Sequence, residues 1–201
     1  WRKLPGDGSS TFRPHTSWSG WQEEGVVGVG KPHEKCKGPS VFRHEGRYLM
    51  YYSSETKWGD SCIALATSSD MVHWEDEGPF ITTHRIENPV QGPSGFECPR
   101  VVKQGDKYYL FVMHFRGLQY AVGDDPFHFG SWQVLGPWHA ATIFSDSRAR
   151  WYISHAYRPF GKPSTMGKFR EPHKGLYIGG LVWSDGVPVP VDLGDILDHG
   201  D

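Results

Sequence analysis

The sequence has few cysteines, almost no net charge and no long apolar run, and each absence excludes a class of protein. Its three cysteines, Cys36, Cys62 and Cys98, form no C-x-x-C pair, which favours buried free thiols over a zinc site and leaves one disulfide as an alternative. The formal net charge is −2 without any Lys/Arg run, which excludes a nucleic-acid surface. No stretch reaches the roughly 20 apolar residues of a membrane helix. We therefore expect neither nucleic acid nor membrane as a partner.

Helical periodicity is also scarce. No convincing amphipathic stretch exceeds two helical turns, and a single turn is predicted only in SSDMVHWEDEG, where Asp70 could cap it. No signal peptide is visible, although one could have preceded Trp1. The sequence leaves localisation open: a secreted or periplasmic location is favoured over a cytoplasmic one.

The residues that are present predict an all-β fold. The chain has 201 residues, 37% of them hydrophobic, with 25 Gly, 15 Pro, 9 Trp, 9 Tyr and 11 Phe. This composition is typical of many short strands joined by turns. The apolar runs are brief, such as PSVFRH, RYLMYYSS, CIALATSS, PRVVKQ, KYYLFVMH, LQYAVG, ATIFSD, RWYISHA and GLYIGGLVW.

These runs repeat along the chain. The segment that begins at Pro39 aligns without a gap with the segment that begins at Pro99, so that Val41 meets Val101 and Tyr48 meets Tyr108. A third copy begins near His139 with the same strand, polar turn and aromatic strand. Each copy continues through a small-residue strand to a tryptophan, which makes a unit of about four strands. A repeated four-stranded antiparallel sheet is a β-propeller blade, whereas a β-sandwich gives no reason for the self-similarity.

The repeats predict a single propeller domain over residues 1–201 that is only partial. Residues 39–98, 99–138 and 139–201 make about three blades, and residues 1–38 form the end of an earlier blade and a linker. Propellers usually have 4 to 8 blades, so this number does not close a ring. We expect either a missing N-terminal portion or a partner, including a second copy of the chain, to complete it.

The strand heads resemble a known family. Glu97-Cys98-Pro99 resembles the E-C-P motif of glycoside hydrolase family 32, and Lys37-Gly38-Pro39 occupies the place of that family's R-D-P. The segment ATSSDMVHW resembles the S-x-D-x-x-x-W blade ending of families 32 and 43, and GPWHAATIF resembles the late-blade histidine segment of family 43. The resemblance covers about residues 33–191 and implies a five-bladed propeller of the glycosidase type.

The resemblance also implies a glycoside hydrolase activity with Glu97 as general acid. Cleaving a glycosidic bond requires a proton donor and a second carboxylate that attacks the sugar or activates water. The implied substrate is a furanosyl or pentosyl oligo- or polysaccharide. The E-C-P motif implies fructan, and the resemblance at His139 implies arabinan or xylan. The alternative role for Glu97 is a strand-end carboxylate that binds a backbone amide or an arginine.

Two departures from the family pattern favour an alternative function. The family aspartate of R-D-P aligns with Gly38, and the first-blade aspartate has no counterpart. Glu34 or Glu87 could substitute, although Glu34 also fits a solvated loop. Otherwise the chain is a carbohydrate-binding or catalytically impaired propeller. A protein-interaction propeller is the third hypothesis, and a glutamate at a channel mouth argues against it.

Several further residues are candidates for binding sugar. Arg85 and Arg100 could bind hydroxyl groups or pair with Glu97, or form plain surface salt bridges. Trp58 and Trp138 could stack on a sugar ring. By resemblance, His139 lies near the central axis, next to a structural calcium ion or a water, or without any metal. We expect no required cofactor and no metal ligand set, because the other histidines lack metal-like spacing.

Overall fold

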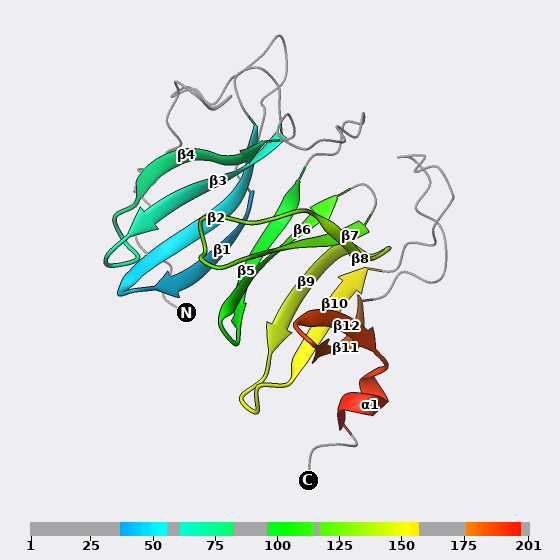
Figure 1. Cartoon of the computed structure of the whole chain (residues 1–201). Helices are drawn as coiled ribbons and strands as arrows, with labels where there is room; N and C mark the ends of the chain where they lie inside the picture. The colour runs from blue at the N-terminus through cyan, green and yellow to red at the C-terminus, as the bar shows by residue number, and fades with distance from the viewer. Residues whose placement is uncertain (1–36, 56–60, 83–95, 115–116, 157–175, 198–201) are drawn as a thin grey trace. The chain divides into compact units, whose positions relative to one another are not determined.

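The computed structural model describes residues 37–55, 61–82, 96–114, 117–156 and 176–197 (Figure 1). The chain divides into two compact units, residues 1–101 and 102–201, and the boundary lies inside the strand β5 (Glu97–Gln104). The described residues form three four-stranded antiparallel sheets and one short helix.

The first sheet has the strand order β1-β2-β3-β4. Its strands are β1 (Lys37–His44), β2 (Arg47–Glu55), β3 (Ser61–Ser68) and β4 (Glu75–Thr82). His44 pairs with Arg47 across a two-residue turn, in which Glu45 and Gly46 have φ of 47° and 81°. Such left-handed residues match the twist of a hairpin. The third strand is buried from Cys62 to Ser68, because it is flanked by strands on both sides and covered on both faces.

The second sheet has the order β5-β6-β7-β8. It contains β5, β6 (Lys107–His114), β7 (Gly117–Gly123) and β8 (Gln133–Gly136). Every residue of β6 after Lys107 is buried, as expected of the near-continuous apolar run KYYLFVMH.

The third sheet has the order β12-β11-β10-β9. It contains β9 (His139–Ser145), β10 (Trp151–Ala156), β11 (Leu176–Ser184) and β12 (Val187–Val191), and α1 (Leu193–Leu197) follows it. The helix lies against β11, where Gly180 has no side chain: a Cβ there would lie 2.2 Å from Cδ1 of Ile196. Gly180 therefore makes room for the only buried side chain of this short helix.

Aromatic side chains pack the second and third sheets together within the unit of residues 102–201. The ring of Trp183 on β11 lies edge-on to Tyr109 on β6, with centroids 4.5 Å apart, and also contacts Phe111. The hydroxyl of Tyr109 donates a hydrogen bond of 2.6 Å to the carbonyl of Gly186 in the β11–β12 turn. One face of β11 is therefore covered by the neighbouring blade.

The predicted fold class is confirmed: the chain is all-β and forms a partial β-propeller of four-stranded blades. The assignment of residues 1–201 to one domain stays a prediction.

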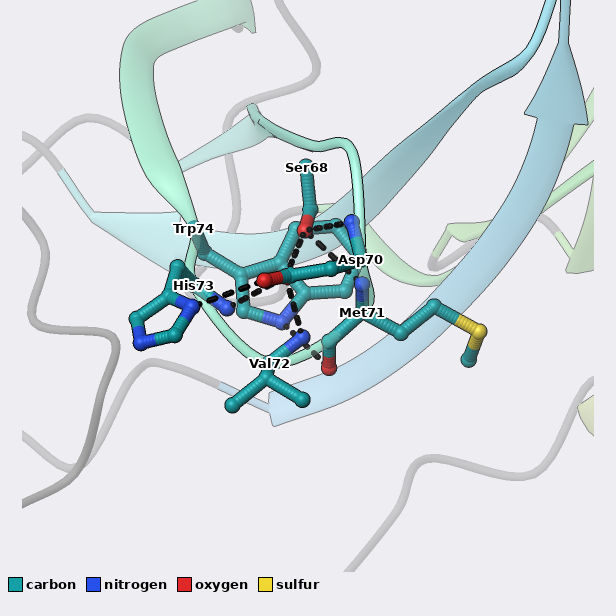
Figure 2. A network of polar contacts seen from close by, with 6 residues as sticks. All are labelled: Ser68, Asp70, Met71, Val72, His73 and Trp74. Atoms are coloured by element: carbon teal, nitrogen blue, oxygen red, sulfur yellow. Dashed lines mark hydrogen bonds and ion pairs between the residues drawn. The ribbon is translucent and has the colours of Figure 1, made fainter.

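The predicted helical turn at Asp70 is wrong, because residues 69–73 form bends instead. Met71 has φ of 64°, which interrupts a right-handed helix. Asp70 still acts as a cap, since its Oδ1 accepts the N–H groups of Val72 and His73, both at 2.8 Å (Figure 2).

Candidate functional site

The head of β5 brings Glu97 next to an unusual backbone position. Glu97 is partly buried at the first residue of the strand. Cys98 follows with φ of 52°, a left-handed conformation that a non-glycine residue rarely adopts. The N–H of Cys98 donates a hydrogen bond of 3.1 Å to Oγ of Ser53 on β2. This contact ties the head of β5 to the first sheet, so Glu97 is anchored through its neighbour.

The head of β1 has the same conformation at the equivalent residue. Gly38 has φ of 63°, and β1 has a register irregularity between Lys37 and Ser40. The repeat alignment pairs Gly38 with Cys98, and the backbone of both residues agrees with that pairing. The two heads also touch: a Cβ on Gly38 would lie 3.3 Å from Cα of Cys98. Position 38 therefore carries no carboxylate and has little room for one.

Two polar atoms close to these strand heads have no hydrogen-bond partner in the part of the chain that the structure describes. They are Oγ of Ser40, a residue that is 5% exposed, and Nε of Arg100, which is partly buried on β5. Arg100 forms no ion pair with a described residue. Both predicted roles of Arg100, sugar-hydroxyl binding and a surface salt bridge, stay predictions. A buried donor without a hydrogen-bond partner costs free energy.

The second unit holds a row of three aromatic rings where β9 begins. Trp138 precedes β9, and its ring lies 5.4 Å from that of His155 on β10. His155 stacks on its cross-strand partner Tyr177 on β11, with centroids 5.7 Å apart and planes at 17°. The six-membered ring of Trp138 also lies against Gly136, where a Cβ would approach within 2.2 Å. Trp138 is thus packed between two neighbours, and Tyr177, at the other end of the row, is 41% exposed.

His139 begins β9, as the repeat predicts, and its backbone pairs with Ala156 next to a register irregularity in β10. Its side chain is not among those described. Another histidine, His114 on β6, is buried, and its Nδ1 accepts a hydrogen bond of 3.2 Å from Nε2 of Gln119. The hydrogen bond assigns the ring proton of a neutral His114 to Nε2.

Three predicted site residues lie outside the described residues: Glu34, Trp58 and Arg85. Glu87, the other acidic substitute, also lies there. Within the described ranges no group of three or more His, Cys, Asp or Glu side chains could hold a metal ion. The structural calcium stays a prediction. No helix among the described residues is long and apolar enough to cross a membrane.

In each of the first two sheets, the connection between the third and the fourth strand contains a hydrogen bond between an aspartate and the histidine three residues later. Asp70 accepts a hydrogen bond from Nδ1 of His73 at 2.8 Å (Figure 2), and Asp125 accepts one from Nδ1 of His128 at 2.9 Å. These side-chain hydrogen bonds, with help from backbone N–H groups, lower the pKa of both aspartates. Asp125 therefore belongs to a turn, in which it bridges to His128.

Sequence reasoning missed Ser53, His155 and Tyr177. Ser53 lies in a run of residues without chemical distinction, and only the fold brings it to Cys98. His155 was one of several histidines without metal-like spacing. The stacked pair of His155 and Tyr177 could have been predicted from position, because both residues lie at strand ends near His139.

Comparison with known proteins identifies the fold. No protein-family model and no curated protein matches the chain. Among solved structures, it is similar to the GH32 β-fructofuranosidase of Bombyx mori, with a TM-score of 0.59 and 16% identity over 88% of this chain. It is also similar to a thermostable family-43 glycoside hydrolase (TM-score 0.52, 20% identity, 78% of this chain) and to the GH43_1 enzyme of Xanthomonas citri complexed with xylotriose (0.52, 17%, 73%).

The chain therefore has the fold of the five-bladed propeller glycosidases of families 32 and 43, as the strand heads predicted. It spans only part of each: 41% of the Bombyx mori structure, 52% of the thermostable enzyme and 50% of the Xanthomonas citri enzyme.

Proposed function

We propose that the chain is part of a glycoside hydrolase in which Glu97 is the general acid. The observation that carries this proposal is the position of Glu97. It lies at the head of an inner blade strand, in the E-C-P sequence, on a backbone fixed by the left-handed Cys98 and its hydrogen bond to Ser53. The fold that surrounds it is one that solved glycosidases share.

The chemistry follows from the requirements of glycosidic cleavage. The protonated carboxyl of Glu97 donates its proton to the glycosidic oxygen as the bond to the anomeric carbon breaks. A second carboxylate attacks that carbon, or activates the water that does so. Position 38 does not supply it, and Glu34 is the candidate that the sequence offers.

The substrate is a furanosyl or pentosyl oligo- or polysaccharide of the fructan, arabinan or xylan type. Arg100 is a candidate for binding a hydroxyl group of this substrate, because its Nε has no hydrogen-bond partner among the described residues. In the second unit, Tyr177 is a separate candidate for stacking on the apolar side of a sugar, because it is 41% exposed and its ring is held by stacking on His155. Arg85, Trp58 and His139 are further candidates.

A specific observation favours a second candidate function, a carbohydrate-binding or catalytically impaired propeller. Gly38 takes the place of the family aspartate, and its left-handed φ and the close approach of Cys98 disfavour any larger residue there. A chain built around glycine at this point has lost whatever that carboxylate contributes to the reaction.

The experiment that separates these functions is sugar release from fructans, arabinan, xylan and aryl glycosides. Wild type is compared with Glu97→Gln and with the matched control Glu75→Gln, whose side chain is 84% exposed on β4. A glycosidase predicts release by wild type and by Glu75→Gln, and a loss of about 10²–10⁴-fold in Glu97→Gln. Saturable sugar binding without release by any of the three proteins would overturn the hydrolase and establish the binding function.

A further inference from the structure

We propose that Ser53 is a positioning residue for the proton transfer that the proposed function assigns to Glu97, and the inference rests on that function. The hydroxyl oxygen of Ser53 accepts a hydrogen bond of 3.1 Å from the N–H of Cys98, the residue that follows Glu97. All three residues lie in the unit of residues 1–101. Ser53 therefore acts on Glu97 through the backbone of Cys98.

The backbone of Cys98 departs from ordinary geometry in two respects. Its φ of 52° lies in the left-handed region, which residues with a Cβ rarely adopt. Cys98 also precedes Pro99, and the residue before a proline prefers an extended backbone. Such a conformation persists only where the surrounding structure enforces it, and outliers of this kind cluster at functional sites. The contact that enforces it at Cys98 is therefore a candidate for a functional role.

The head of β1 shows that this backbone shape does not require a strained residue. Gly38 has a similar φ of 63° and also precedes a proline, Pro39, but glycine adopts this conformation without steric cost. Only the head that carries Glu97 has a residue with a side chain at this position. The conformation of Cys98 depends on its contacts, and the hydrogen bond to Ser53 is one of them.

The location of Ser53 suits this role. Ser53 lies on β2, and its backbone pairs with Lys37 beside Gly38, where the head of β1 approaches Cys98. The residue is 3% exposed, so water competes little for its hydroxyl oxygen. A hydrogen bond is stronger in such surroundings than at the surface.

Glu97 would move if this hydrogen bond were lost. Phe96 is 1% exposed and Pro99 is buried, so packing restrains the chain on both sides of Glu97 and Cys98. Relaxation of Cys98 toward an extended backbone would therefore be taken up at Glu97. A displacement of about 1 Å can cost about 10²-fold in rate. Loss of the Ser53 hydroxyl should thus weaken proton donation while the carboxyl itself remains.

The test is the kinetics of Ser53→Ala on a natural oligosaccharide and on a dinitrophenyl glycoside of the same sugar. We expect kcat on the oligosaccharide to fall by about tenfold to hundredfold with KM unchanged. The dinitrophenyl glycoside should be cleaved at nearly the wild-type rate, because its leaving group needs no proton. Ser53→Thr keeps the accepting oxygen and should restore the rate on the oligosaccharide.

Ser54→Ala is the matched control. Ser54 is the next residue of β2 and is also 3% exposed, but its side chain points to the opposite face of the sheet. Both rates should stay near those of the wild type. Circular dichroism verifies folding, and Ser53→Cys, whose thiol is a weak acceptor, replaces Ser53→Ala if the latter is not folded.

Amide hydrogen exchange measures the contact without relying on activity. The N–H of Cys98 should exchange about five- to tenfold faster in Ser53→Ala than in the wild type. Unchanged exchange, wild-type kinetics in Ser53→Ala, or equal losses on the two substrates would overturn the positioning role and leave Glu97 as the acid. An equal loss in Ser54→Ala would do the same. No sugar release by the wild type would instead overturn the proposed function, and this inference with it.

Discussion

Gly38 and Cys98 meet at the heads of two successive blades, and both have a left-handed backbone. Their φ values are 63° and 52°, and a Cβ on Gly38 would lie 3.3 Å from Cα of Cys98. The contact positions the residue that follows Glu97 and, at the same time, disfavours a side chain at position 38. The geometry that supports the proposed acid thus also disfavours the carboxylate that the family places at position 38.

Gly38→Ala should destabilise the protein more than Gly105→Ala. Both glycines have a similar φ, 63° and 58°, but a Cβ on Gly105 meets nothing within 4 Å. We expect about 1–2 kcal/mol from the left-handed conformation alone at Gly105. A further loss of about 1 kcal/mol at Gly38 should come from the crowding against Cys98. Urea denaturation measures both free energies of unfolding, and equal losses would contradict the close approach.

Tyr109→Phe should lower the free energy of unfolding by about 1 kcal/mol. The hydroxyl of Tyr109 donates to the carbonyl of Gly186, and this hydrogen bond joins the second and third sheets within their unit. Tyr48→Phe is the control, because that ring is only partly buried and stacks under Arg43. If the two variants unfold at the same urea concentration, the hydrogen bond contributes nothing measurable.

Stability should fall in acid partly through Asp146. Burial of this carboxyl would raise its pKa, but hydrogen bonds from Arg150, Tyr152 and the backbone outweigh burial and lower the pKa to about 2. An unfolded aspartate has a pKa of about 3.9, so the carboxylate stabilises the fold above about pH 4. This contribution is lost between about pH 4 and pH 2.

The variant that tests this pH dependence is Asp146→Asn. Urea midpoints measured from pH 7 to pH 2 should differ between wild type and variant at neutral pH and converge at pH 2. A constant difference over the whole range would show that the charge of Asp146 is not responsible.

Tyr177→Ala should weaken oligosaccharide binding by roughly three- to tenfold, the effect of losing one aromatic stacking contact. The measurement is calorimetric titration in a Glu97→Gln background, in which the sugar is not consumed. Tyr48→Ala serves as the control in the other unit. Unchanged affinity in Tyr177→Ala would show that the aromatic row does not bind sugar, without bearing on Glu97.

The sequence predicted the parts of the fold that are repeated. The gapless alignment of the segments at Pro39 and Pro99 corresponds to β1 and β5, and both strands begin two residues before the proline. A repeat is visible because each blade must bury the same strands. The helical turn at Asp70 was predicted wrongly, since the sequence pattern does not reveal that Met71 adopts φ of 64°.

The candidate site was less accessible to sequence reasoning. Glu97 was found because it lies in a motif at a strand head. The bond from Cys98 to Ser53 joins residues 45 positions apart and depends on how two sheets meet. His155 and Tyr177 are also far apart in sequence, and only the register of β10 and β11 makes them a stacked pair.

The central claim is that Glu97 donates a proton to the leaving group, and leaving-group dependence tests it most directly. Hydrolysis by Glu97→Gln is compared with wild type on a natural oligosaccharide and on a dinitrophenyl glycoside of the same sugar, whose leaving group needs no proton. The account predicts a loss of about 10²–10⁴-fold on the oligosaccharide and little loss on the dinitrophenyl glycoside. Equal losses on both substrates, or full activity on the oligosaccharide, would contradict it.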